Sequence, residues 1–128
     1  MSTIFQKIIT REIPAYIIEE DEFNIAFLDV NPLKEGHTLV IPKKEVDYIF
    51  EIENEDLESL IVFAKKVAIK IKKSISCTKI GVTVIGLEVP HAHIHLIPMD
   101  SIADMNFSNQ KLKISTERML EVQSMINS

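Results

Sequence analysis

Three histidines alternate with apolar residues in one short stretch, His91-Ala-His-Ile-His-Leu-Ile97. Such alternation is typical of a β-strand, in which successive side chains point to opposite faces of a sheet. The pattern therefore predicts a strand over residues 91–97 with the imidazoles of His91, His93 and His95 on one face, each about 7 Å from the next. The apolar residues between them are expected to face a long helix.

Four more segments have the composition of strands, so the strand with the histidines is expected to belong to an antiparallel sheet of about five strands. These segments are residues 15–18, 23–28, 37–42 and 79–86. The first two are separated by a charged stretch and read as a hairpin. Only four residues separate the segment 79–86 from His91, which favours antiparallel pairing. Pro42 cannot donate a backbone hydrogen bond, so the segment 37–42 is expected either to be an edge strand or to have Pro42 at its end.

Helical periodicity appears in three places. An apolar stripe from Leu57 to Ile71 recurs at i, i+3 and i+4 and predicts one long helix. Isoleucines at helical spacing predict a short N-terminal helix that Ser2 or Thr3 can cap and that Pro14 ends. Apolar residues after Ser115 predict a C-terminal helical tail. Strands and helices in this arrangement predict the α+β class, with helices packed on the sheet.

The bulk composition excludes several classes of protein. A chain of 128 residues has room for one ordinary domain. A formal net charge of −5 argues against a nucleic-acid groove, which needs a basic surface. No apolar run approaches the ~20 residues that span a membrane. The single cysteine, Cys77, permits no internal disulfide, and no signal peptide is evident, so a cytoplasmic location is expected.

A row of imidazoles is suited to phosphoryl chemistry. Neutral imidazole is a nucleophile near pH 7 and can also act as a general acid or base. Repulsion between neighbouring rings is expected to keep at least one of them neutral while a neighbour stays protonated. One ring can then attack phosphorus while others stabilise the oxygens or the leaving group. His37 begins another predicted strand and could lie beside this row.

A metal site is an alternative interpretation of the same residues. The spacing His-x-His on a strand is common among zinc ligands, and His37 could supply a third nitrogen. No aspartate or glutamate stands at an obvious fourth-ligand spacing, and no Cys-x-x-Cys accompanies the histidines.

The histidine motif resembles the signature of the histidine triad (HIT) family, in particular its nucleoside-phosphoramidase branch. The similarity extends to other stretches: Ile4-Phe-Gln-Lys-Ile-Ile9, Arg11-Glu-Ile-Pro14, Ala26-Phe-Leu-Asp-Val30, Asn31-Pro32 and Gly36-His-Thr-Leu-Val-Ile-Pro-Lys-Lys44. It covers about residues 3 to 99. The organisation expected from it is a HIT domain over residues 1–100 and a C-terminal extension, residues 101–128, packed on the same domain.

The resemblance implies a homodimer that forms a covalent nucleotidyl intermediate on the middle histidine, His93. It implies that His95 contacts the phosphate and assists protonation of the leaving group, and that His37 and His91 form a supporting polar chain. Related nucleotidyltransferases carry a glutamine at the third position of the triad. His95 therefore favours hydrolysis over transfer.

The resemblance also implies how the nucleoside is bound. Asp29 matches the carboxylate that accepts hydrogen bonds from the ribose hydroxyls. Four residues match the apolar positions around the base: Ile13, Phe27, Val30 and Leu39.

The chain departs from the family in two places. Family members carry an asparagine and a glycine-rich loop ending in Gln-Ser or Gln-Thr before the triad, whereas this chain has Ile85-Gly-Leu-Glu-Val-Pro90, with Glu88 near the expected hydroxyl. A carboxylate there would repel a phosphate, so one hypothesis is that Glu88 turns toward an amine leaving group or a triad histidine. The zinc-binding branch has Cys-x-x-Cys where this chain has Thr3 and Gln6, so no structural zinc or other cofactor is expected.

Together these features predict a hydrolase of nucleoside 5′-phosphate derivatives: phosphoramidates, nucleotidyl conjugates or dinucleoside polyphosphates. The alternative from another class is a nucleotide-binding module with little turnover, because the phosphate-donor loop is altered.

Overall fold

The apolar stripe of the central segment forms the long helix that the sequence predicts. In the computed structural model, which describes residues 3–128, helix α2 spans Asn54–Ser74. Acidic side chains occupy its first turn and lysines its last turn, and both placements complement the helix dipole. Leu60, Val67 and Ile71 are fully buried against the sheet.

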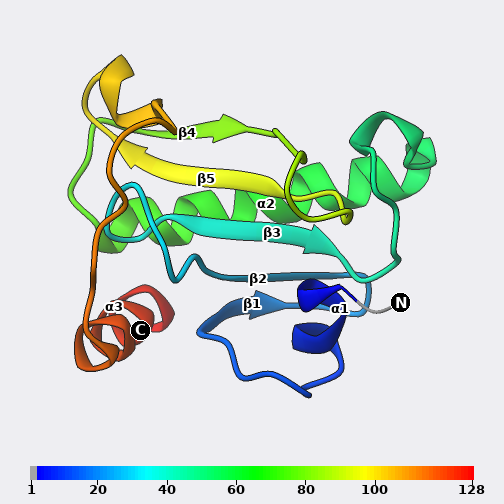
Figure 1. Ribbon diagram of the computed structural model, residues 1–128, viewed down its shortest axis with the longest axis horizontal. Helices are drawn as coiled ribbons and strands as arrows, with labels where there is room; N and C mark the ends of the chain where they lie inside the picture. The colour runs from blue at the N-terminus through cyan, green and yellow to red at the C-terminus, as the bar shows by residue number, and fades with distance from the viewer. Residues whose placement is uncertain (1–2) are drawn as a thin grey trace.

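Five strands form one antiparallel sheet in the order β1-β2-β3-β5-β4. The strands are β1 (Ile17–Glu20), β2 (Asn24–Leu28), β3 (Thr38–Pro42), β4 (Lys79–Thr83) and β5 (Ile94–Met99). The helices are α1 (Ile4–Ile9), α2 and α3 (Thr116–Asn127), with 3-10 turns η1 (Ile49–Glu51) and η2 (Ile102–Met105). The predicted α+β class, the five antiparallel strands and the three helices are confirmed (Figure 1).

Several predicted boundaries are wrong. The first predicted strand, 15–18, is observed at Ile17–Glu20, and the predicted strand 79–86 ends at Thr83. The strand of the histidines begins at Ile94 rather than His91, because residues 91–93 do not join a ladder; Ala92 N–H donates instead to the Val46 carbonyl. Helix α1, capped by Thr3, ends at Ile9, well before Pro14. Arg11 follows in the left-handed region at φ 67° and turns the chain out of the helix. Ser2 lies outside the described residues.

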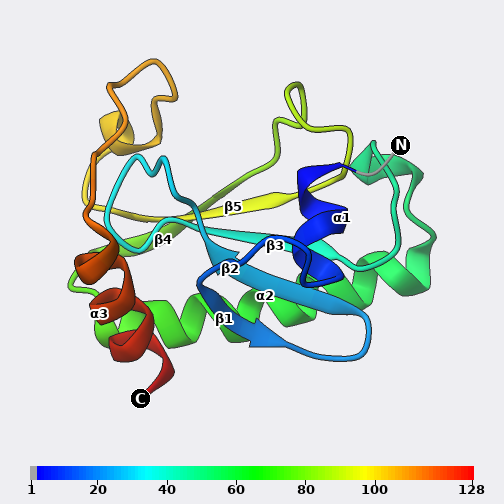
Figure 2. The ribbon, with the colours of Figure 1, turned by 60° about the horizontal axis from the view of Figure 1, so that its bottom comes forward.

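Each face of the sheet has its own hydrophobic cluster. One face packs against α2 and α3, and Ile94 and Leu96 of β5 point into this cluster as the alternation predicts. The other face carries the residues of β2 and β3 that pack against Phe5 and Ile8 of α1. Figure 2 shows α2 on one side of the sheet, with α1 and the loops before and after β5 on the other. The histidines of the triad therefore share a face with α1.

The segment after β5 folds back over the histidine face. A Cβ at Gly81 would lie 2.6 Å from the Met105 sulfur and 2.9 Å from that of Met99, so the ends of these two side chains pack directly over this glycine. Farther on, the guanidinium of Arg118 in α3 donates two hydrogen bonds, of 2.9 and 2.6 Å, to the carboxylate of Glu35. The C-terminal residues are thereby fixed to the loop that precedes His37.

Substituting Gly81 by valine is expected to displace the flexible end of Met105 and to lower the free energy of unfolding by about 1 kcal/mol, the lower end of the range typical of overpacking. Urea denaturation measures the loss. The double variant Gly81→Val/Met105→Ala should recover part of it, because the shorter side chain makes room for valine. Equal losses in the single and double variants would contradict this contact.

No helix within residues 3–128 is both long enough and apolar enough to cross a membrane.

Candidate active site

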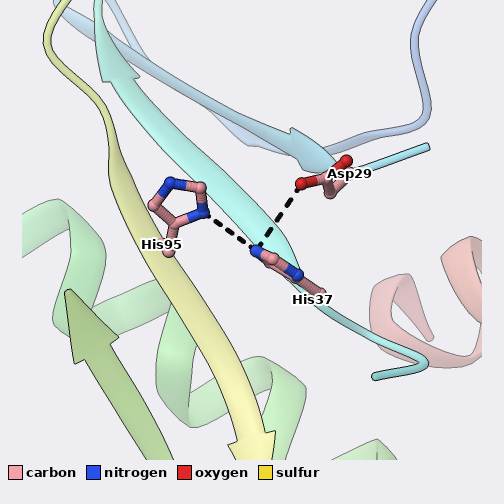
Figure 3. Close-up of side chains that lie close together, drawn as sticks. All are labelled: Asp29, His37 and His95. Atoms are coloured by element: carbon pink, nitrogen blue, oxygen red, sulfur yellow. Dashed lines mark hydrogen bonds and ion pairs between the residues drawn. The ribbon is translucent and has the colours of Figure 1, made fainter. Parts of the chain in front are cut away.

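Strands β3 and β5 bring two histidines together that are 58 positions apart in the chain. The register pairs Leu39 with His95, and His37 stands just before β3 on the same face. Gly36, at φ 94°, makes the turn that leads into His37. The predicted proximity of His37 to the triad is confirmed: His37 Nε2 lies 2.9 Å from His95 Nδ1 (Figure 3).

The hydrogen bonds of His37 fix the protonation of both rings. The backbone N–H of Leu33 donates to His37 Nδ1 at 3.0 Å, so this nitrogen carries no proton. In the neutral ring the proton then lies on His37 Nε2, which donates to His95 Nδ1. His95 in turn carries its proton on Nε2. His95 Nε2–H is therefore available to donate a hydrogen bond to a ligand.

The ring of His93 has the opposite tautomer. Its Nδ1 lies 2.8 Å from the backbone carbonyl oxygen of His91, which can only accept, so Nδ1 carries the proton. His93 Nε2 is left with a lone pair. The rings of Phe5 and His95 each have a centroid 5.0 Å from that of His93, in edge-to-face contacts that hold the ring in place.

His91 is fully buried and lies behind His93. Its Nε2 donates to the Pro42 carbonyl oxygen at 2.8 Å, while its Nδ1 has no hydrogen-bond partner within residues 3–128. His37 and His91 thus support the site separately: His37 through the ring of His95, and His91 through its carbonyl to His93. The resemblance implied one chain of hydrogen bonds through His37 and His91, whereas the structure has two separate chains, one through each of these histidines.

Burial keeps the supporting imidazoles neutral. It lowers the pKa of His37 to about 4, with a smaller contribution from the charge of Lys111. It also lowers the pKa of His95 to about 4, and the neighbouring His37 and His93 act in the same direction. The pKa of His91 is lowered by burial as well. Near pH 7 these rings are therefore uncharged, consistent with the tautomers given above. The prediction that a neighbouring ring stays protonated is wrong for all three, because burial disfavours the charged form of each.

Asp29 lies at the end of β2 beside His37 (Figure 3). Its Oδ1 accepts a hydrogen bond of 2.8 Å from the Asn31 backbone N–H, and its Oδ2 lies 3.6 Å from His37 Nε2. The carboxylate is 19% exposed, so it remains accessible to a ligand. Its position suits an acceptor of hydrogen bonds from a diol.

Two cavities meet at His93 and His95. The first, of about 330 Å³, is apolar and extends from the triad toward α1. Its lining includes all four residues that the resemblance assigned to the base: Ile13, Phe27, Val30 and Leu39. Phe27 and Leu39 are buried, whereas Val30 is 62% exposed and lies at the rim.

The second cavity, of about 310 Å³, lies on the other side of the two histidines. Glu88 is exposed and lines both cavities, so it stands at their junction. Phe107 and Lys111 line the second cavity but not the first. The centroid of the Phe107 ring lies 4.9 Å from that of the His95 ring. The sequence does not reveal these two residues, because they lie in an irregular polar segment with no periodicity or motif.

The structure places the carboxylate of Asp29 beside two of the histidines considered as metal ligands. Donor atoms of Asp29, His37 and His95 lie within 4.8 Å of one another, although no sequence spacing indicated the aspartate. Two nitrogens bound to one tetrahedral zinc lie about 3.3 Å apart. Here the nitrogens of His37 and His95 are hydrogen-bonded to each other at 2.9 Å. An ion would therefore have to break this hydrogen bond, and the arrangement fits a proton better than a metal.

Comparisons with known proteins agree with this geometry. The HIT domain family model matches residues 10–102. An uncharacterized HIT-like protein of Borreliella burgdorferi is 34% identical over 97% of this chain and 95% of its own length. The adenosine 5′-monophosphoramidase HNT1 of Saccharomyces cerevisiae is 38% identical over 74% of this chain and 61% of its own length.

A solved structure has the same fold over nearly the whole chain. The crystal structure of a Hit-like protein from Bartonella henselae superimposes with a TM-score of 0.84 at 32% identity, covering 98% of this chain and 95% of that one. The family model spans the site from Asp29 to His95, and the α+β fold is common to these proteins. The chain belongs to the histidine triad (HIT) family.

Proposed function

We propose that this protein hydrolyses nucleoside 5′-phosphate derivatives through a covalent nucleotidyl intermediate on His93. The observation that carries the proposal is the pair of opposite tautomers. His93 has an unprotonated Nε2, because its Nδ1 donates to the His91 carbonyl, and His95 beside it has a protonated Nε2. A nucleophile and a hydrogen-bond donor therefore stand next to each other between two cavities.

The reaction proceeds in two displacements at the α-phosphorus. The lone pair of His93 Nε2 forms a bond to phosphorus, and the bond to the leaving nitrogen or oxygen breaks with its electron pair. His95 Nε2–H donates a hydrogen bond at the leaving atom, which takes up a proton from solvent as it departs. Water then attacks phosphorus and releases a proton to solvent, the bond between phosphorus and His93 Nε2 breaks and restores the lone pair of the ring, and a nucleoside monophosphate is released.

The environment of the triad keeps the supporting imidazoles of His37 and His95 neutral. Because the pKa values of His37 and His95 are about 4, neither ring is cationic near pH 7. Their contribution is therefore the orientation of hydrogen bonds rather than positive charge. The resemblance of the chain to the yeast adenosine 5′-monophosphoramidase supports a phosphorus–nitrogen bond as one target.

The chemistry is tested by mixing the protein with a fluorogenic adenosine 5′-phosphoramidate. Mass spectrometry should detect a covalent adduct with the mass of the adenylyl group on the peptide that contains His93, together with release of the amine. Tight binding with neither adduct nor turnover would support the nucleotide-binding module instead.

Replacing Asp29 by asparagine is expected to lower kcat/KM for an adenosine phosphoramidate about 10- to 100-fold. The amide keeps an acceptor for Asn31 N–H but loses the charge that strengthens hydrogen bonds from the ribose hydroxyls. The matched control is the 2′,3′-dideoxyadenosine substrate, which lacks both hydroxyls. The variant and the wild-type protein should cleave that substrate at similar rates, and an equal loss on both substrates would exclude the ribose role.

We also propose that the protein acts in the cytoplasm as a homodimer. Strand β4 lies at an edge of the sheet, and α2 contacts it. Apolar side chains are exposed on both elements, among them Val82 at 61% and Val62 at 67%. An edge strand with exposed apolar neighbours favours pairing with a second copy. Light scattering should give twice the mass of one chain.

A further inference from the structure

Most of the residues that line the second cavity are not used by the proposed binding of the nucleoside. The first cavity offers the apolar surface for a base, and Asp29 and the triad lie where the two cavities meet. A nucleotide bound with its base in the first cavity and its phosphorus at His93 leaves the second cavity for the group on the other side of the scissile bond. The residues that line only the second cavity therefore contact the leaving group.

Lys111 is the cation of this second cavity. Its side chain is half-buried, and its Nζ donates a hydrogen bond of 2.7 Å to the Phe107 carbonyl oxygen. Within residues 3–128 no carboxylate lies within 4.0 Å of this ammonium group, although eight lysine or arginine ion pairs are formed elsewhere. A partly buried cation without an anionic partner is stabilised by a bound anion.

The backbone holds Lys111 in place at the triad. The next residue, Leu112, donates its N–H to the Pro32 carbonyl at 2.8 Å, which fastens the segment to the loop that follows Asp29. The ammonium also lies 5.5 Å from the ring centroid of Phe107, whose own ring packs edge-on against His95. The position of the charge is thus fixed relative to the reacting atoms.

We propose that Lys111 binds a negatively charged group on the leaving group, a carboxylate or a phosphate, and so determines which nucleotide derivatives the enzyme prefers. The inference rests on the proposed function and adds the chemistry of the leaving group to it. Glu88 lines the same cavity but is exposed, so solvent screens its charge more strongly than that of the half-buried Lys111. The charge of Lys111 also reaches the triad, since it contributes to the lowered pKa values of His37 and His95, after burial.

Four adenosine 5′-phosphoramidates, each joined through the nitrogen of its amine, test this role. Glycine and glycinamide form one matched pair, with and without a carboxylate. O-Phosphoethanolamine and ethanolamine form the second pair, with and without a phosphate. The wild-type protein is expected to cleave the charged member of at least one pair with a kcat/KM about tenfold higher, as for one partly exposed ion pair. The pair that shows the preference identifies the source of the anion.

The variant Lys111→Met should abolish this preference, so that the charged and neutral members of each pair are cleaved with kcat/KM values within about twofold of each other. Lys111→Arg, which keeps the positive charge, should retain the preference for the charged amine. Lys113→Met is the matched control, because Lys113 is exposed and lies outside the cavity, yet its loss changes the net charge equally.

Three results would overturn the assignment of Lys111: no preference for a charged amine in the wild type, an equal loss on all four substrates in Lys111→Met, or the same change in Lys113→Met. In each of these cases the proposed hydrolysis stands. The absence of turnover on all four substrates would overturn the proposed function itself.

Discussion

Replacing His93 by alanine is expected to lower kcat on an adenosine phosphoramidate by at least about 10⁴-fold, as for loss of other enzymatic nucleophiles. The variant lacks the Nε2 lone pair that attacks phosphorus, and no neighbouring ring can replace it. His95 Nε2 carries a proton, and His91 lies fully buried behind the site. Steady-state turnover and the disappearance of the covalent adduct measure the effect.

Binding of the product should survive in the His93→Ala variant, because the cavity for the base and Asp29 are unchanged. Isothermal titration with adenosine monophosphate is therefore the control for folding. The variant loses edge-to-face contacts with Phe5 and His95 and the hydrogen bond to the His91 carbonyl, so the free energy of unfolding is expected to fall by about 2–4 kcal/mol. Turnover within tenfold of wild type would exclude His93 as the nucleophile.

The second large effect is on stability in mild acid. An unfolded histidine titrates near pH 6.5, whereas His37 and His95 have pKa values of about 4 in the folded protein. Between these pH values the unfolded chain binds more protons, so the free energy of unfolding falls as the pH is lowered from about 6.5 to about 4. From pH 7.5 to pH 5 each ring is expected to remove about 2 kcal/mol, or about 4 kcal/mol together.

The hydrogen bonds give this titration its physical reason. A proton added to His37 Nδ1 displaces the bond from Leu33 N–H, and a proton added to His95 Nδ1 opposes the donor of His37. The salt-bridged carboxylates of Glu20 and Glu35, whose pKa values are lowered by Lys43 and Arg118, lose their stabilisation only at more acidic pH.

Urea denaturation at pH 7.5 and pH 5 measures the difference in the free energy of unfolding. The variant His95→Gln removes one titrating ring but keeps a hydrogen-bonding side chain, so its difference should be about 2 kcal/mol smaller than that of the wild type. Equal stability of the wild-type protein at the two pH values would show that the two imidazoles are not held neutral by the fold.

Much of the fold follows from the sequence because its periodicities are strong. The stripe of α2 and the alternation around His95 predict which faces are buried, and the structure confirms both. The boundaries were less predictable. Residues 91–93 alternate as a strand does, but their backbone bonds to the loop at Val46 instead of joining a ladder, and no local pattern encodes that partner.

The site was predictable as far as the motif extends. The sequence places the imidazoles on one face and His37 beside them, and the structure brings them together. It does not reveal that Leu33 N–H fixes the tautomer of His37, because a backbone amide is the same in every residue. Nor does it reveal Phe107 and Lys111, which reach the triad through a turn of the chain that has no regular spacing.

The pairing of β3 with β5 has a consequence for how the protein folds. The contact between His37 and His95 closes a loop of 58 positions that contains the whole of α2. Such a long closure has a large entropic cost and forms slowly compared with the helix itself. During synthesis the segment up to α2 therefore emerges without a reactive centre, and the chain becomes competent for chemistry only when its last third has joined the sheet.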